Sequence, residues 1–183
     1  SYDRVFKKIQ AVVVPGGFGD RGTESMINIL KYIREKNIPT LGICLGMQLM
    51  AIEYARNVLG LDDANSTEFK KNCKYPIYQM MDGQLRLGDQ EILIQKGSIA
   101  EAIYKSDKIL QRHRHRYGMI NPEYIKQFNE SGFKISAFST YNNLTVSEFS
   151  ELPKHDCYIG CQFHPEFHSR HRETDPILPY LIK

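Results

Sequence analysis

Gly42-Ile43-Cys44-Leu45-Gly46 (GICLG) follows a short turn-rich segment, Lys36–Thr40, and precedes apolar residues that recur at helical spacing up to Ala55. A strand that turns sharply into a helix through a Gly-x-nucleophile-x-Gly sequence is a nucleophile elbow. Its glycines allow a tight turn from which the central side chain projects. We therefore predict a strand, an elbow at Cys44 and a helix.

Cys44 would stand at the N-terminus of that helix, where the helix dipole favours a thiolate over a thiol. The alternative is a buried cysteine with a purely structural role. These five residues alone leave both interpretations open.

The segments before the elbow predict an α/β fold. Ala11–Val14 is a β-branched run that indicates a buried strand, and it leads into a glycine-rich loop, Pro15–Glu24 (PGGFGDRGTE). The loop matches neither a Walker sequence nor Gly-x-Gly-x-x-Gly, but its free N–H groups suit an anion. Apolar residues from Met26 to Ile33 then indicate a helix. This order predicts a parallel sheet flanked by helices, with ligands at the carboxyl ends of the strands.

The rest of the chain contains weaker signals. Arg56–Phe69 is polar and turn-rich, and long loops of this kind are usually functional. The pattern further predicts a β-excursion from Met81 to Ile94, short helices at Ser98–Tyr104 and Pro122–Glu130, a hairpin formed by Phe133–Ser139 and Leu144–Phe149, and a last strand from Tyr158 to His164.

Composition indicates one soluble domain. The chain has 183 residues, of which 42% are hydrophobic, and this is enough for a packed core. A net charge of +3 is too small to indicate nucleic acid or a membrane surface, and no apolar run reaches the length of a membrane-spanning helix. The four cysteines (Cys44, Cys73, Cys157 and Cys161) lack the spacing of a disulfide framework. We therefore expect reduced thiols and a cytoplasmic location.

Gln162–Phe167 (QFHPEF) supplies the groups that a reactive cysteine needs. A nucleophilic thiol requires a nearby base, and the base requires an acceptor that fixes its tautomer. Glu166 lies two positions after His164, so both side chains can point to the same side at a strand end, and Pro165 stiffens the segment. A lone histidine is more often a core or surface residue, but its combination with the elbow favours catalysis.

Arg112–Tyr117 (RHRHRY) alternates basic and imidazole side chains. On a strand, Arg112, Arg114 and Arg116 would lie on one face, and His113, His115 and Tyr117 on the other. A nucleic-acid patch is one alternative, but interleaved aromatic residues and a basic surround are absent. A metal site on His113 and His115 is another, but no carboxylate or cysteine lies at ligand spacing, so we predict no metal.

Taken together, PGGFG, GICLGMQ and QFHPEF resemble the class I (triad) glutamine amidotransferases. Five further stretches resemble the glutaminase domain of the CTP synthases in particular: DRGTE, ARNVLG, DANSTEF, RLG and RHRHRY. The similarity extends with gaps from Ala11 to Phe167. It implies a flavodoxin-like α/β fold with a mostly parallel central sheet.

The resemblance also implies a mechanism. Cys44 would attack the side-chain amide of L-glutamine and form a γ-glutamyl thioester, His164 would act as acid and base, and Glu166 would orient His164. Backbone N–H groups of Leu45 and Gly17 would hold the oxyanion.

Further residues would bind the substrate by the same resemblance. Gln48 would contact glutamine, Glu68 would pair with its α-ammonium group, and Arg116, next to Tyr117, would bind its α-carboxylate. Phe18 and the DRGTE stretch would form a lid near the place where GTP activates the enzyme.

The implied function is glutamine hydrolysis that supplies ammonia for the ATP-dependent amination of UTP to CTP. The synthetase domain of the same polypeptide would hold ATP and Mg²⁺, and the glutaminase domain would need no cofactor. We expect residues 1–183 to form this domain without its first strand and helix and without the synthetase domain, and the complete enzyme to be a homotetramer. A Pro-Glu-His segment usual between Phe69 and Gly83 is also missing. The alternatives are an amidotransferase subunit of another pathway and a non-catalytic module with the same fold.

Overall fold

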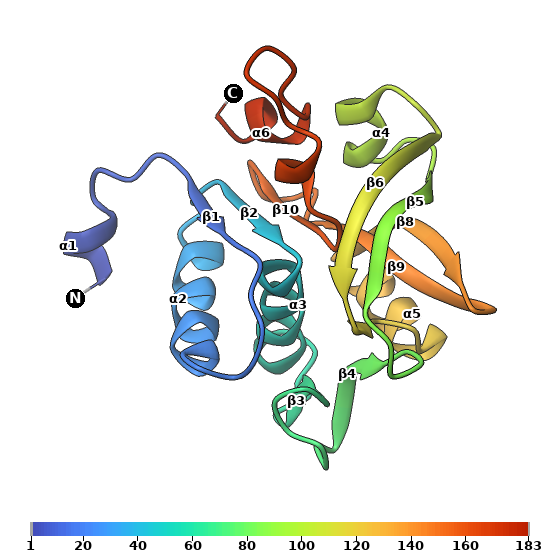
Figure 1. The fold of residues 1–183 in the computed structure, drawn as a ribbon. Helices are drawn as coiled ribbons and strands as arrows, with labels where there is room; N and C mark the ends of the chain where they lie inside the picture. Colours follow the sequence, from blue (N-terminus) through green and yellow to red (C-terminus); the bar gives the residue numbers. More distant parts are fainter. Residues whose placement is uncertain (1, 183) are drawn as a thin grey trace.

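The computed structural model describes residues 2–182, so that Ser1 and Lys183 lie outside the described part, and it centres on a seven-stranded sheet with helices on both faces (Figure 1). The strand order is β1-β2-β10-β9-β8-β5-β6. The strands are β1 (Val12–Val14), β2 (Thr40–Ile43), β5 (Arg86–Ile94), β6 (Lys108–His115), β8 (Lys134–Tyr141), β9 (Leu144–Glu151) and β10 (Tyr158–Cys161).

The predicted α/β fold with flanking helices is confirmed, but the expectation of a mostly parallel sheet needs correction. Parallel pairing is confined to β1, β2 and β10, and every other pairing in this sheet is antiparallel. The physical reason lies in the connections. Asn142 and Asn143 join β8 to β9 with positive φ angles of 46° and 64°, the conformation of a tight hairpin turn, and such a turn forces antiparallel pairing.

Helices cover both faces of the sheet and define two hydrophobic cores. The helices are α1 (Tyr2–Phe6), α2 (Thr23–Glu35), α3 (Leu45–Asn57), α4 (Ile99–Tyr104), α5 (Pro122–Ser131), η1 (Pro165–Phe167) and α6 (Ile177–Leu181). One core contains the buried faces of α2, α3 and α5, and the other contains those of α4 and α6. Because successive strand residues point to opposite faces, Tyr158 joins the first core, and Ile159 and Cys161 join the second.

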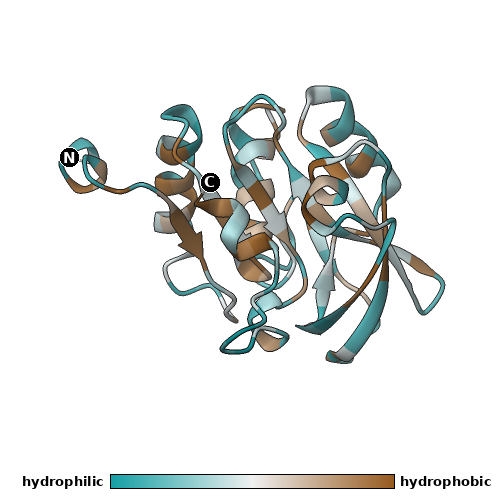
Figure 2. Cartoon of the chain, turned by 90° about the horizontal axis from the view of Figure 1, so that it is seen from above, coloured by the Kyte–Doolittle hydropathy of each residue, from teal (hydrophilic) through white to brown (hydrophobic). Residues whose placement is uncertain are grey.

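Helix α3 is the central helix of the fold. All residues from Leu45 to Ala55 are buried, including the polar Gln48 and Glu53. Figure 2 shows hydrophobic residues gathered on the strands and on the helix sides that face them, with hydrophilic residues in the loops. The predicted helix after the elbow is therefore confirmed, and its burial on all sides explains why it has no polar face.

The elbow differs from the prediction in where its strain lies. Cys44 itself has a φ of 51°, whereas Gly42 and Gly46 do not have positive φ angles. The two glycines are needed for close packing instead. A Cβ on Gly46 would lie 2.1 Å from the Val14 carbonyl oxygen, and one on Gly42 would lie 2.6 Å from the backbone of Gly46. The turn is therefore pressed against β1 with no space for a side chain on either glycine.

The polar segment Arg56–Phe69 contains a strand that its sequence does not indicate. β3 (Ala64–Ser66) is buried and pairs with β4 (Tyr75–Met80), which also pairs with β7 (Tyr117–Gly118). This second sheet has three strands. It contains Tyr117, the last residue of the RHRHRY stretch, and Ala64–Ser66, which lies shortly before Glu68, so the two segments lie close together.

A partly buried ion pair joins α2 to α3. Arg34 donates two hydrogen bonds to the Glu53 carboxylate at 2.8 and 2.9 Å, and the Glu53 side chain has no exposed surface. Arg56 makes a comparable pair with Glu24, but the Glu24 side chain is 66% exposed. The two pairs differ mainly in solvent access.

We predict that Glu53→Ala lowers the free energy of unfolding by about 3–5 kcal/mol, because it leaves the largely buried Arg34 with only the exposed Glu35 carboxylate, 4.0 Å away, as a counter-charge. Glu24→Ala, the matched change at the exposed pair, should cost at most about 1 kcal/mol. Urea unfolding followed by circular dichroism measures both. Equal losses in the two variants would contradict the assignment of the Arg34–Glu53 pair as a major stabilising contact.

Candidate active site

The parallel strands deliver three predicted site segments to one place. The glycine-rich loop follows β1, the elbow follows β2, and the His164 segment follows β10, so all three lie at the carboxyl ends of adjacent strands. A narrow pocket of about 20 Å³ opens there, enough for about one water molecule, so an amino acid would enter only if the lining side chains moved apart. Its lining consists of Gly17, Phe18, Cys44, Leu45, Gln48, Glu68, His115, Arg116 and Tyr117.

This lining includes every residue that the sequence predicts for oxyanion or substrate binding. Residues as far apart as Gly17 and Tyr117 meet in it, and Cys44 lies among them. His164 and Glu166 are not part of the lining but lie beside Cys44, and His115 lines the pocket without having been assigned a binding role.

Cys44 is a neutral thiol in this setting. Burial raises its pKa to about 12, and the negative charges of Glu166 and Glu68 act in the same direction. Hydrogen bonds from the Leu45 backbone N–H and the Gln162 side chain act in the opposite direction but do not outweigh burial. The expectation that the helix N-terminus favours a thiolate therefore needs correction, because burial has the larger effect here.

His164 carries a free lone pair next to Cys44. Its Nδ1 lies 2.6 Å from Glu166 Oε1, and because an ionised carboxylate can only accept, Nδ1 carries a proton, so that in the neutral ring the lone pair is on Nε2. Nε2 is buried and has no hydrogen-bond partner among residues 2–182. A Cβ on Gly16 would lie 2.7 Å from His164 Cε1 and 3.5 Å from Cys44 Cβ, so the two side chains converge on Gly16. The ring also stacks on Phe167, with centroids 4.5 Å apart.

The thiol and the imidazole are not hydrogen-bonded to each other in the resting structure. Cys44 Sγ instead lies 3.9 Å from the carbonyl oxygen of Arg114 and accepts from Gln162 Nε2 at 3.5 Å. Catalytic hydrogen bonds of ligand-free enzymes are often long and tighten when substrate binds. Transfer of the thiol proton to His164 would therefore require the S–H bond to turn from the Arg114 carbonyl oxygen toward His164 Nε2.

Glu166 is ionised at neutral pH. Burial acts to raise its pKa, but the hydrogen bond from His164 and one from a backbone N–H lower it, and the net pKa lies below the usual value. A lowered pKa means that the charged form, and with it the contact to His164, is present at neutral pH and is lost only as the pH falls through the lowered value. Glu166 thus holds the tautomer that leaves Nε2 free.

Two contacts hold the glycine-rich loop beside the pocket. The Gly19 N–H donates to Glu68 Oε1 at 2.9 Å, and the Arg114 guanidinium lies 5.4 Å from the centroid of the Phe18 ring. Phe18 itself is 55% exposed. Glu68 therefore contacts the loop and the pocket at the same time.

Two polar groups of the pocket are available to a ligand. Gln48 Nε2 donates to Tyr117 O and Gln162 Oε1, but its Oε1 is buried and has no partner among the described residues. The Arg116 guanidinium has no hydrogen bond or ion pair to another side chain in the range 2–182. The pocket thus offers an acceptor and a cation, together with the Glu68 carboxylate.

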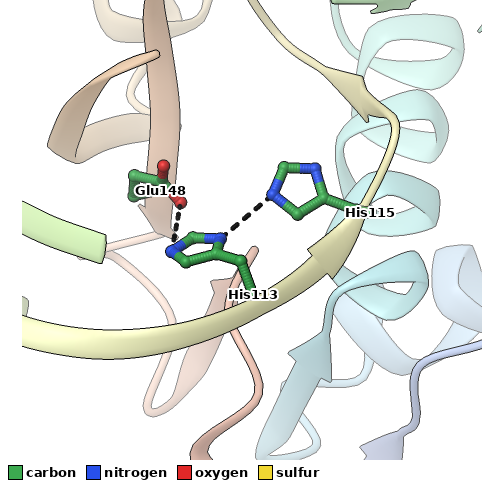
Figure 3. Close-up of side chains that lie close together, drawn as sticks. All are labelled: His113, His115 and Glu148. Carbon is green, nitrogen blue, oxygen red and sulfur yellow. Dashed lines mark hydrogen bonds and ion pairs between the residues drawn. The ribbon is translucent and has the colours of Figure 1, made fainter. Parts of the chain in front are cut away.

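The alternation predicted for RHRHRY is confirmed along β6, and its buried histidines enter a hydrogen-bond network (Figure 3). His115 Nδ1 lies 2.8 Å from Tyr117 O, so Nδ1 carries the proton and Nε2 accepts from His113 Nδ1 at 3.0 Å. His113 Nε2 faces Glu148 Oε2 at 3.7 Å. Arg86 lies 2.5 Å from Glu148 Oε1 and 3.4 Å from His115 Nε2.

These contacts correct one premise of the sequence analysis and bear on the metal question. A carboxylate, Glu148, does lie at ligand distance from His113 and His115, but it comes from β9 and no local spacing reveals it. The lone pair of His115 Nε2 is already used, and the Arg86 guanidinium supplies the positive charge beside Glu148. The three side chains thus belong to a hydrogen-bond network around a buried arginine, in which His113 Nε2 and Glu148 Oε2 have no hydrogen-bond partner among the described residues.

Sequence reasoning missed Gln162 as a site residue. It is fully buried and donates to Cys44 Sγ. The available signal was a polar residue at the end of an otherwise apolar strand, directly before Phe163 and His164.

Comparisons with known proteins identify relatives over the whole chain. The family described as Glutamine amidotransferase class-I matches residues 2–183. The glutaminase domain of the Trypanosoma brucei CTPS, solved with bound acivicin, has a TM-score of 0.89 and 34% sequence identity, and the match covers 99% of this chain and 71% of that one.

Curated relatives are longer than this chain. CTP synthase from Methanococcoides burtonii is 47% identical over 174 residues, which cover 90% of this chain and 32% of the relative. CTP synthase from a Hydrogenobaculum species is 48% identical over 177 residues, with 92% and 33% covered. The chain thus spans about a third of the length of these relatives. None of the helices described here is long and apolar enough to cross a membrane.

We predict that alkylation of Cys44 by iodoacetamide in the ligand-free chain accelerates continuously from about pH 6 to about pH 10, because only the thiolate reacts and the pKa lies above this range. Mass spectrometry of digests separates Cys44 from the half-buried Cys73, which serves as an internal reference. A rate plateau near neutral pH would contradict the neutral thiol and indicate a preformed thiolate–imidazolium pair.

Proposed function

Because the chain belongs to the class I glutamine amidotransferases, and within them to the glutaminase domains of CTP synthase, we propose that Cys44, His164 and Glu166 hydrolyse the side-chain amide of L-glutamine to glutamate and ammonia. One observation carries this assignment. A cysteine at a strained elbow lies beside a histidine whose free Nε2 has no other partner among the described residues. A nucleophile and its base are thus next to a pocket that is lined by Gln48, Glu68 and Arg116.

In the first half of the reaction, Cys44 Sγ attacks the amide carbon while its proton passes to His164 Nε2. The C–N bond of the tetrahedral intermediate then breaks, and His164 returns the proton to the departing ammonia. A γ-glutamyl thioester on Cys44 remains. Glu166 orients the ring and stabilises the imidazolium that forms.

In the second half, water attacks the thioester carbonyl and gives its proton to His164. Glutamate leaves, and the thiol of Cys44 is restored. Gly17 and Leu45 line the pocket on the side of Cys44, and their backbone N–H groups would hold the oxyanion in both halves. Loss of one such donor typically reduces the rate about 10²–10³-fold.

The pocket carries complementary groups for a free amino acid. Glu68 would bind the α-ammonium group, and Arg116, which has no ion-pair partner in the described range, would bind the α-carboxylate. The unpartnered Gln48 Oε1 would accept a hydrogen bond from the substrate, and Tyr117 would complete the wall. Recognition of both α-substituents selects free glutamine over an amide within a protein chain.

The ammonia would serve the amination of UTP to CTP in a synthetase domain of the same polypeptide. ATP and Mg²⁺ would bind there, and GTP would act near Phe18 and the adjoining DRGTE stretch. The resemblance further implies a homotetrameric complete enzyme in the cytoplasm.

Two rival functions are less well supported. An amidotransferase subunit of another pathway fits the triad, but the identity to CTP synthases argues against it. A non-catalytic module would not need an unpartnered Nε2 beside a cysteine.

We predict that Cys44→Ala reduces ammonia release from glutamine to the background rate. Glu166→Ala should keep a rate about a hundredfold above that background, because the orienting residue contributes less than the nucleophile. Ammonia is measured with coupled glutamate dehydrogenase, and Cys73→Ala is the matched control that should keep full activity. A glutamine-like electrophile should label Cys44 alone. Ammonia release by Cys44→Ala would refute the assignment.

We further predict that Arg116→Met raises KM for glutamine about 10–100-fold and changes kcat little, since a charge-assisted contact to the substrate is lost. Arg112→Met removes an exposed arginine of β6 that does not line the pocket, so its KM should equal that of the wild type. If both variants behaved alike, Arg116 would have no direct role in binding.

A further inference from the structure

Gln162 is a buried residue directly after β10, and both polar contacts of its side chain lie at the active site. Its backbone N–H donates to Glu148 O at 2.9 Å, which holds the main chain in place. Its side-chain Oε1 accepts from Gln48 Nε2 at 3.2 Å, and its Nε2 donates to Cys44 Sγ at 3.5 Å.

The direction of this amide follows from an anchor that cannot be reversed. The carbonyl oxygen of Tyr117 can only accept hydrogen bonds, so the Gln48 group that faces it at 3.4 Å must be the NH₂. The same NH₂ faces Gln162, which must therefore present its oxygen to Gln48. The remaining NH₂ of Gln162 then points at the Cys44 sulfur.

The anchor itself is held by the buried network behind the pocket. His115 Nδ1 donates to the same Tyr117 oxygen, and Arg86 and His113 fix the His115 ring from the other side. The row of hydrogen bonds from Tyr117 through Gln48 to Gln162 thus begins at a carbonyl oxygen that His115 holds in place. An N–H donor held in this way needs no reorganisation when charge develops on sulfur.

The sulfur lies in surroundings that oppose a negative charge. Burial and the negative charges of Glu166 and Glu68 disfavour the thiolate. The side chains of Tyr78 and Cys161 also lie near the sulfur, and neither can carry a positive charge that would stabilise it. Besides His164, the groups that favour the thiolate are the Leu45 N–H and the Gln162 side chain.

We propose that Gln162 is a positioning residue of the active site, which orients the Cys44 sulfur and stabilises the thiolate that forms when His164 removes the proton. This role rests on the proposed glutamine hydrolysis for its purpose, but the contact itself is independent of any substrate. A buried glutamine that merely fills the core would not need its NH₂ aimed at sulfur.

The test compares Gln162→Met, which keeps the length of the side chain and removes the donor, with the wild-type chain. We expect iodoacetamide to alkylate Cys44 about tenfold more slowly at every pH from about 7 to about 9.5, since the hydrogen bond to an ionised group is lost. In glutamine hydrolysis, kcat should fall by a similar factor with KM nearly unchanged. Unchanged alkylation in a folded variant would overturn the proposal.

Gln111→Met is the matched control. Gln111 is also a buried glutamine, but its amide bonds to Asp175 at 2.6 Å, and it does not line the pocket. The same substitution there should leave the rate and the pH profile of Cys44 alkylation unchanged. If Gln111→Met slowed alkylation as much as Gln162→Met, the effect would be a general loosening of the fold, and the proposal would fail.

Gln162→Glu provides a second variant with nearly the same shape. Its carboxylate keeps an acceptor toward Gln48 but cannot donate to sulfur once ionised, so its deficit in alkylation should deepen as the pH rises. Should both variants fail to fold, nuclear magnetic resonance of the wild-type chain decides, because the Gln162 side-chain N–H signals should shift when Cys44 is alkylated. Unshifted signals would overturn the proposal.

The two proposals fail separately. A wild-type chain that releases no ammonia from glutamine refutes the proposed function, but the alkylation comparison needs no glutamine and still reports on Gln162. Conversely, active enzyme with unaltered alkylation in Gln162→Met refutes only the role of Gln162.

Discussion

The tight turn at Cys44 is the constraint on which the rest of this structure depends. A non-glycine residue with a φ of 51° is strained by about 1–2 kcal/mol, and the turn persists because its surroundings hold it. The Cys44 N–H donates to Cys161 O at 2.7 Å, and Gly46 packs directly on the carbonyl of Val14. These contacts lock β2 between β1 and β10. The same locking brings the loop after β1 and the histidine after β10 to the sulfur.

Burial and hydrogen bonding set the protonation states of the side chains in the site. Desolvation keeps Cys44 neutral, while hydrogen bonding keeps Glu166 ionised and the His164 Nε2 lone pair free. A thiol, a bare imidazole nitrogen and an anchored carboxylate form a chain in which a proton can move without a net charge entering the pocket. The buried Arg86–Glu148 pair behind the pocket plays a different part, because Arg86 contacts the His115 ring, and His115 holds the Tyr117 carbonyl oxygen that orients the Gln48 amide.

Local patterns predicted many elements because the local physics is strong. β-branched runs and helical spacing each indicate one segment without help from the rest of the chain. The hairpin of β8 and β9 was predicted, but the mixed sheet as a whole was not, because the antiparallel pairings of β9 with β10 and of β5 with β8 join segments that are far apart in sequence. β3 was missed for a related reason: Ala64–Ser66 is polar in sequence and becomes a buried strand only when β4 lies beside it.

The sequence by itself determined which groups the candidate site contains: an elbow cysteine, a histidine with its carboxylate, a glycine-rich loop and the charged residues that line one pocket. These features are local motifs, and each is written in a few adjacent residues. The tertiary structure alone decided the state of the groups. The high pKa of Cys44, the direction of the Gln162 amide and the approach of Glu148 to His113 and His115 arise from residues far apart in sequence, since burial and hydrogen-bond direction are set by what the fold places around a side chain.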